Sequence, residues 1–293
     1  MSEDSALENL RQDIRERGQT DKILPIFWIL LPLVGVGVSI ITGIIASVLA
    51  ISTASMGFDF EPGVGFVPGP GPGSFGAFPF NPGVFTTVAV GFLGGLISTL
   101  LYVYLFYLLI NRRNKHFARQ SRFSEDLINY VKNVSDRKKG VDIQTGVSSL
   151  ERSTRDVRYE EVEKSAGLWA ILTIIPFVNL FAILYILYFL GTDYRRHEIR
   201  ENGFIEDTNK VLDKLGLGGI PERRLDPIPD RSFVLYLVLT VVTLGLFGIY
   251  WLYTLITDPN NHFKHHVKWE DELIANLEVK TKQPSKQPRK ESS

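Results

Sequence analysis

The 293-residue chain contains no cysteine, which excludes disulfide bonds, thiol nucleophiles and metal sites built on cysteine. It also lacks net charge, because 32 Lys and Arg balance 32 Asp and Glu. A general nucleic-acid binder needs a clear excess of basic residues, so nucleic acid is not an expected partner. There is no glycine-rich phosphate loop, no His-Glu-x-x-His motif and no Ser and His pair in a recognisable setting. The sequence therefore predicts no catalytic residue, no cofactor and no enzyme activity.

Charged residues and histidine are absent from four long apolar blocks, at 24–53, 84–110, 167–191 and 233–256. About 20 residues at 1.5 Å rise cross a hydrocarbon core of about 30 Å, so each block is long enough to span a membrane. The first 23 residues lack the basic start of a cleavable signal peptide, so the first block should stay as an anchor. The predicted fold class is an all-α integral membrane protein with four apolar helical segments.

Lys and Arg are also absent from the loop at 54–83, whereas 13 of them lie in 112–166. By the positive-inside rule the loop is external, and the N-terminus and the 112–166 region are cytoplasmic. The blocks at 24–53 and 84–110 should therefore cross the membrane once each. The expected location is the cell membrane, with both termini cytoplasmic.

The blocks at 167–191 and 233–256 allow two topologies. Four simple crossings are the default, but they place the loop at 192–231, with eight Lys and Arg, outside. In the alternative, each block is a re-entrant hairpin that turns at 176–179 or 243–245. Limbs of about 11 residues would reach about 16 Å, half of the hydrocarbon core.

A motif of the form Tyr-x2-Tyr-x8-His-x6-aromatic-x-acid-acid follows each of the last three blocks. Six matching positions in three copies predict that one membrane-anchored unit was copied within the gene. The copies are Tyr104, Tyr107, His116, Phe123, Glu125 and Asp126; Tyr185, Tyr188, His197, Phe204, Glu206 and Asp207; and Tyr250, Tyr253, His262, Trp269, Asp271 and Glu272.

The positions of the motif suggest separate roles for its parts. The tyrosine pairs fall at block ends, where aromatic rings sit well at headgroup depth. The chain beyond them is expected to form a surface helix, since Phe123, Leu127 and Val131 recur every four residues. The acidic pair falls on another face of that helix and is expected to be solvated.

The histidines of the motif are the candidate metal ligands. His262 and His266 have the i, i+4 spacing that lets two imidazoles share one ion, and His116 and His197 would complete the set. The simpler interpretation is that each histidine pairs with a carboxylate or packs on the aromatic residue of its motif. A pH-sensitive contact is a further option, because histidine titrates near neutrality.

Small residues form a stripe in the first apolar block. Gly35, Ser39, Gly43 and Ser47 recur every four residues, and Gly91 and Gly95 could meet them from the second block. Packing between the two helices of one chain is the expected use. Homodimerisation is the alternative.

The remaining segments complete the predicted organisation. An amphipathic helix is expected within 1–23, and 84–131, 167–215 and 232–280 each combine an apolar segment with a motif helix. The segment 54–83 is a Gly, Pro and Phe-rich loop, 132–166 a cytoplasmic connector, 216–231 a linker, and 281–293 a disordered basic tail.

The run Leu-Thr-Val-Val-Thr-Leu-Gly-Leu-Phe-Gly-Ile-Tyr-Trp-Leu-Tyr at 239–253 resembles the signature of an uncharacterised prokaryotic membrane family, a domain of unknown function, over about 234–277. The resemblance implies a prokaryotic multi-pass membrane protein and no activity. The function expected from the sequence is a non-enzymatic scaffold or assembly element, which presents its repeated cytoplasmic helices to a protein partner or a second copy. The alternative is a metal-binding or pH-responsive membrane subunit that uses the motif histidines.

Overall fold

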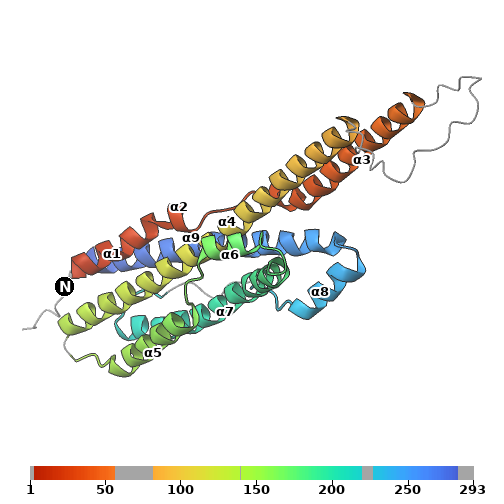
Figure 1. Cartoon of the computed structure of the whole chain (residues 1–293). Coiled ribbons are helices and arrows are strands. Elements are labelled where there is room, and N and C mark those ends of the chain that lie inside the picture. Colours follow the sequence, from red (N-terminus) through yellow and green to blue (C-terminus); the bar gives the residue numbers. More distant parts are fainter. Residues whose placement is uncertain (1–2, 57–81, 139, 220–226, 283–293) are drawn as a thin grey trace, which may run out of the picture. The chain divides into compact units, whose positions relative to one another are not determined.

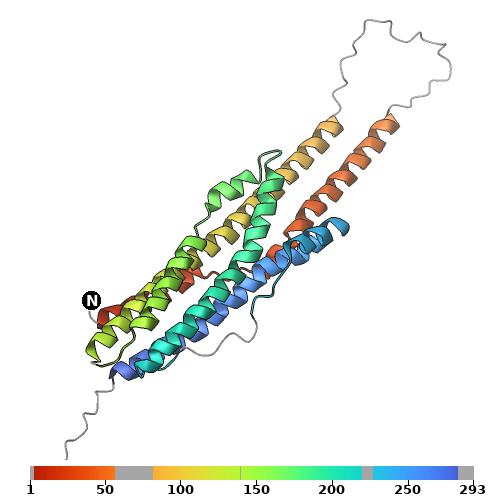
Figure 2. The same cartoon turned by 90° about the horizontal axis from the view of Figure 1, so that it is seen from below.

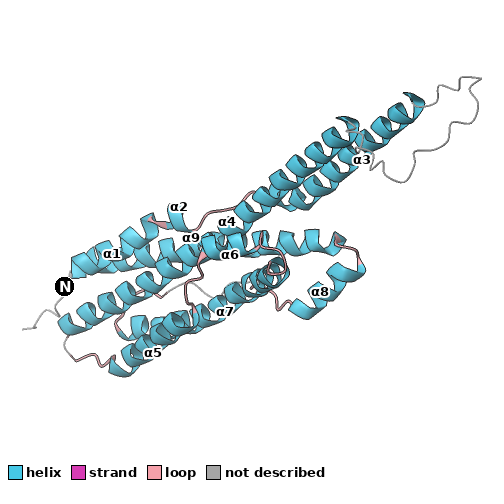
Figure 3. Cartoon of the chain, viewed as in Figure 1, coloured by secondary structure: helices cyan, strands magenta, loops and turns pink. Residues whose placement is uncertain are grey.

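The computed structural model describes residues 3–56, 82–138, 140–219 and 227–282, and all regular secondary structure in these ranges is helical (Figure 3). The predicted all-α class is confirmed for this part of the chain. The expectations for the Phe-rich loop and the basic tail fall almost wholly outside it. The chain divides into two compact units, Met1–Trp28 with Leu105–Ser293, and Ile29–Tyr104.

The smaller unit is formed by the turn η1 (Ile26–Leu30), helix α3 (Leu31–Met56) and the first part of helix α4 (Pro82–Arg137). In the described residues, one stretch is long and apolar enough to cross a membrane, and it lies in α4. It supports an association of the chain with a membrane.

The contact between α3 and α4 includes Gly91, one of the glycines predicted to pack there, and also Gly94, which was not predicted. A Cβ on Gly94 would lie 2.1 Å from Val38 Cγ1, and one on Gly91 would lie 3.9 Å from Thr42 Cγ2. The corresponding positions at Gly35, Gly43 and Gly95 face open space. The helices therefore approach through Gly91 and Gly94, because these two glycines leave room for the branched side chains of α3.

The larger unit is a helical bundle whose long members lie side by side in both views (Figures 1 and 2). Its helices are α1 (Glu3–Arg15), α2 (Arg17–Thr20), the second part of α4, α5 (Gln144–Glu160), α6 (Ala166–Leu172), α7 (Asn179–Lys214), α8 (Phe233–Val242) and α9 (Leu246–Lys282). The predicted connector at 132–166 thus contains a helix of 17 residues that packs on α7.

The motif helices of α4, α7 and α9 are core elements, so the expected surface location was wrong. Phe123, Phe204 and Trp269 are buried in one hydrophobic core, together with Leu127 and Leu273. The apolar faces were read correctly, but they bury one another because three amphipathic helices can share a single core.

Helix α1, the amphipathic helix expected within 1–23, also belongs to this core. Ala6, Leu7 and Leu10 are buried within it. Arg11 Nη2 lies 2.8 Å from Glu278 Oε1 on α9 and fixes the register of the two ends of the chain.

The two last apolar blocks are folded as helical hairpins (Figure 1). Helix α6 turns into α7 around Phe177, which has φ 65°, and α8 turns into α9 through Leu244 and Gly245, with φ 52° and 93°. A single straight helix is therefore not formed by either block.

Candidate metal centre

Three helices of the bundle bring four histidines to one point. His116 lies on α4, His197 on α7, and His262 and His266 on α9. One potential ligand atom from each lies within 4.8 Å of all the others. All four side chains are buried, with at most 5 % of any side chain exposed.

The nitrogens are spaced as the ligands of a single ion would be. His262 Nε2 lies 3.2 Å from His116 Nε2 and 3.0 Å from His266 Nε2. Four nitrogens arranged tetrahedrally at about 2.0–2.1 Å from a zinc ion would be about 3.3 Å apart. These two separations differ from a zinc geometry by only a few tenths of an ångström, and all four potential ligand atoms lie within 4.8 Å of one another.

The other ring nitrogen faces a carboxylate at three of the four histidines. The Nδ1 atom of His116 lies 3.0 Å from Asp21 Oδ1, that of His197 lies 2.9 Å from Glu161 Oε2, and that of His266 lies 3.1 Å from Glu270 Oε1. The fourth, His262 Nδ1, lies 3.6 Å from Glu198 Oε1. Metal-bound histidines usually have such a carboxylate partner, which fixes the ring orientation and leaves Nε2 with its lone pair.

Two arginines, the buried Arg119 and the half-buried Arg200, hold these carboxylates in place. Arg119 lies between two of them, with Nη2 2.7 Å from Asp21 Oδ2 and Nη1 2.9 Å from Glu270 Oε1. Arg200 Nη2 lies 2.7 Å from Glu161 Oε1. The guanidinium groups neutralise the outer carboxylates, so the centre itself is surrounded by an ordered shell of ion pairs.

Glu201 supplies a carboxylate directly among the histidines. Its Oε1 atom lies 2.9 Å from His266 Nε2, and its Oε2 atom lies 3.8 Å from His262 Nε2. His197 Nε2 is buried and has no hydrogen-bond partner among the described residues. Since the Glu201 carboxylate lies among the histidine Nε2 atoms, it is a candidate fifth ligand.

The surroundings favour the neutral imidazole at His116 and His262 and the protonated imidazolium at His266. Burial lowers the pKa of His116, and burial together with the charge of His266 lowers the pKa of His262 to about 4. Burial opposes protonation of His266 as well, but Glu201 and Glu270 raise its pKa to about 9. A metal ion at this point could replace that proton, because both bind the same lone pair.

Aromatic rings close the remaining sides of the centre. Phe117 stacks on His197 with 4.4 Å between ring centroids, and Phe263 lies 4.6 Å from the ring of His116. Apolar walls of this kind limit the access of water and strengthen electrostatic interactions inside.

Sequence reasoning named these four histidines, and the structure brings all of them together. The carboxylates were missed, because Asp21 and Glu161 lie outside the repeated motif and Glu198, Glu201 and Glu270 occupy its unspecified positions. Two of them had a usable signal: Glu201 follows His197 by four residues and Glu270 follows His266 by four, which places each pair on one face of a helix.

The other motif residues lie away from the centre. The six tyrosines are exposed by 38 to 51 % at the ends of the apolar segments. The acidic pairs make outer contacts: Glu125 with Arg158, Asp126 with Asn9, Glu206 and Asp207 with Lys210, and Asp271 with Arg17, while Glu272 is exposed.

Comparison with known proteins gives a single partial match. A family model described as a domain of unknown function (DUF4234) matches residues 231–275, a range that includes α8, His262 and His266. No curated protein and no solved structure matches the chain. The comparisons thus support an uncharacterised family for this segment and bring no activity with them.

Proposed function

We propose that this chain is a membrane-anchored metal-binding protein, in which four histidines hold one divalent first-row transition metal ion. Imidazole ligands suit zinc, copper, nickel and iron, and a tetrahedral set of nitrogens suits zinc best. The bound ion would join α4, α7 and α9 and thereby stabilise the bundle. No reaction is assigned to it.

One observation carries this proposal: the potential ligand atoms of four buried histidines converge within 4.8 Å. At His116, His197 and His266 the Nδ1 atom faces a carboxylate, so a ring that donates Nδ1–H to it turns its Nε2 lone pair toward the centre, where a metal ion would bind.

In this proposal the chain is a multi-pass protein of the cell membrane, with both termini in the cytoplasm. The apolar part of α4 and the absence of Lys and Arg from 54–83 support it. If the three motif copies arose by duplication of one unit, histidines at the same motif position would be expected to meet at one site.

Metal analysis of the full chain, purified in detergent, tests the proposal. We expect about one equivalent of a transition metal per chain, or binding of one equivalent of added Zn²⁺ to chelator-treated protein. A double substitution, His262→Ala with His266→Ala, should abolish that binding.

His265→Ala is the matched control, since His265 lies on the same helix but is not one of the four clustered residues. It should bind metal like the wild type. If chelator-treated wild-type protein takes up none of zinc, cobalt, nickel, copper or iron and gains no thermal stability from them, the proposal is wrong.

A scaffold role is the second candidate, but with a different surface from the one predicted. A groove of about 490 Å³ lies beside α4 and the end of α5, and Lys115, Phe117 and Arg158 are among its lining residues. A photocrosslinker at Lys115 should capture one defined protein in cells, whereas one at Lys268 on α9 should not. Equal and diffuse labelling from both positions would exclude this surface.

A further inference from the structure

The two hairpins of the bundle have the same parts in the same order. Each begins with a basic residue followed by a serine that caps the first limb: the hydroxyl of Ser165 accepts from the Leu168 amide, and that of Ser232 accepts from the Leu235 amide. Each ends, after the exposed tyrosine pair, at an aspartate, Asp193 or Asp258. Between these ends neither hairpin contains a charged residue.

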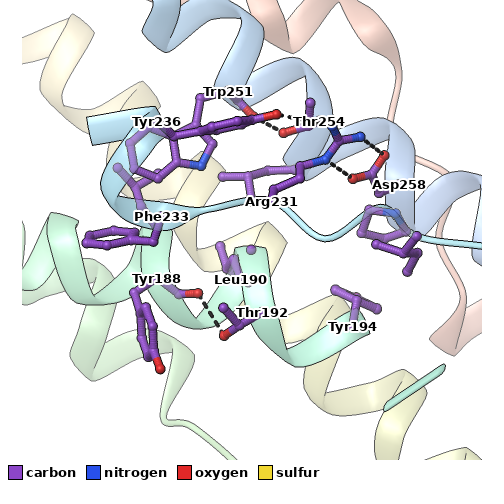
Figure 4. A pocket seen from close by; sticks show the side chains of 15 residues that line it. Tyr188, Leu190, Thr192, Tyr194, Arg231, Phe233, Tyr236, Trp251, Thr254 and Asp258 are labelled. Atoms are coloured by element: carbon purple, nitrogen blue, oxygen red, sulfur yellow. Dashed lines mark hydrogen bonds and ion pairs between the residues drawn. The ribbon is translucent and has the colours of Figure 1, made fainter. Parts of the chain in front are cut away.

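An ion pair closes the base of each hairpin. Lys164 Nζ lies 3.9 Å from Asp193 Oδ2, which is held more closely, at 2.7 Å, by Arg113 Nη2 of α4. Arg231 forms two bonds of 2.9 and 3.0 Å to Asp258. Figure 4 shows Arg231 directed at Asp258, below Tyr236 and Trp251 of the second hairpin. The Arg231 guanidinium also donates to the hydroxyl of Tyr236 at 3.1 Å. Charge and amphipathic rings at one level are typical of a membrane interface.

The opposite end of each hairpin is an exposed apolar tip. Phe177 is 93 % exposed and Leu244 is 94 % exposed, and both have positive φ. The limbs behind them also expose large apolar side chains, among them Ile171, Leu180, Phe181, Val234, Val241, Val242 and Leu246. In water this surface would be costly, whereas hydrocarbon solvates it.

Both turns form local hydrogen bonds to their own backbone groups, which lowers the cost of placing a turn within hydrocarbon. The Gly245 amide donates to Thr240 O at 2.7 Å, and the Phe247 amide donates to the Thr243 hydroxyl at 2.9 Å. In the first hairpin the amides of Val178 and Asn179 both donate to Ile175 O. These local bonds reduce the number of turn groups that need water or a partner helix.

The two ends of each hairpin meet in one bundle. Glu161, before the first hairpin, contacts His197 after it at 2.9 Å. Glu198, before the second hairpin, lies 3.6 Å from His262 after it. A segment whose two ends pack together on one side of a membrane cannot have crossed it.

We infer that α6–α7 and α8–α9 are re-entrant hairpins, which insert into one leaflet of a lipid bilayer and return to the side from which they came. The 11 residues of 246–256 reach about 16 Å at 1.5 Å per residue, which is about half of the hydrocarbon core. Phe177 and Leu244 lie deepest, and the Lys164–Asp193 and Arg231–Asp258 pairs lie at the interface. This inference does not depend on metal binding.

The absence of native cysteine makes depth measurable with single nitroxide labels. We would label Phe177→Cys, Leu244→Cys, the base position Ser232→Cys and the bundle position Lys264→Cys, each in the full chain in phosphatidylcholine and phosphatidylglycerol vesicles. Collision with oxygen relative to a water-soluble nickel chelate should be severalfold higher at both tips than at Lys264, with Ser232 between them. Tips as accessible to the nickel chelate as Lys264 would overturn insertion.

Sidedness separates hairpins from crossings. Cysteines at Asn202 and Lys264, which flank the second hairpin, should react with an impermeant maleimide from the same side of the membrane in cells. Reaction from opposite sides would show that 233–256 crosses, and the inference would fail even if the tips proved to be deep.

Discussion

At the scale of single residues, the carboxylates behind the histidines decide how well the centre binds metal. Asp21 holds His116 and is itself held by Arg119, so Asp21→Asn should weaken the affinity for Zn²⁺ by about 10- to 100-fold. Competition with a chromophoric chelator measures that affinity. Asp271→Asn changes an exposed carboxylate on α9 and should leave the affinity unchanged. Equal losses in both variants would contradict a role for Asp21 in orienting the ring.

Glu201 can be tested separately from the histidines. As a fifth ligand, its carboxylate would alter the absorption of bound Co²⁺ in the visible range, because coordination number sets that spectrum. Glu201→Gln should shift the spectrum toward a four-coordinate form while one equivalent of Co²⁺ still binds. Glu206→Gln, one turn further along α7 and exposed, is the control. A spectrum identical to that of the wild type would remove Glu201 from the ligand set.

Asp13 is a buried carboxylate that costs stability at neutral pH. Burial raises its pKa to about 6, from 3.8, and Oδ2 has no hydrogen-bond partner among the described residues. The Asp13 carboxyl group binds its proton more tightly in the folded state than in the unfolded state. Its contribution to stability is therefore full below about pH 4 and is lost as the pH rises through about 6.

Asp13→Asn should therefore stabilise the protein at pH 7.5 by about 1 kcal/mol, a value reduced for partial solvent screening. The gain should disappear near pH 4. Thermal unfolding in detergent at both pH values provides the measurement, and Asp136→Asn, at an exposed position of α4, is the control. A gain that is equal at both pH values would refute the assignment.

At the scale of helices, the contact between α5 and α7 depends on one glycine. A Cβ on Gly146 would lie 2.5 Å from Val211 Cγ2, and Val211 is buried. Gly146→Ala should thus destabilise the bundle by about 1–3 kcal/mol through overpacking. Gly203→Ala, on α7 where a Cβ meets no atom within 4 Å, should be neutral or stabilise by up to about 1 kcal/mol. If the two variants unfold at the same temperature, α5 does not pack as described.

The same scale shows what could be predicted from the sequence. Charge-free stretches and four-residue periodicity located the helices of α4, α7 and α9, because burial leaves a direct trace in residue type. Periodicity does not say what covers an apolar face, so Phe123 and Trp269 were expected at a surface. The extent of helix α5 within the connector and its packing on α7 were not predicted, since its buried residues Val147, Leu150 and Thr154 are few among charged ones.

The candidate metal centre could also be predicted only in part. A repeat marks residues that recur, and this identified His116, His197 and His262. Asp21 and Glu161 approach from outside the motif helices, through contacts 95 and 36 residues apart in the chain, which no local pattern encodes.

At the scale of the whole chain, a bound ion should act as a crosslink between distant segments. A ligand that binds only the folded state at 100 times its dissociation constant adds about 2.7 kcal/mol to stability. Removing metal with a chelator should lower the midpoint of thermal unfolding, and Zn²⁺ should restore it. In the double variant with His262→Ala and His266→Ala, neither treatment should have an effect. A midpoint insensitive to metal in the wild type would show that the centre does not support the fold.

The pairing of α1 with α9 also constrains biosynthesis. Arg11 bonds to a residue 267 positions later, and Ala6, Leu7 and Leu10 are buried in a core to which the last helix contributes. At translation rates of about 5–20 residues per second, the N-terminal helix waits roughly 15–50 s for that surface to be made. During this interval its apolar side is open to chaperones and proteases. The half-life of the nascent chain should therefore depend on how fast ribosomes reach the part of the messenger RNA that encodes α9.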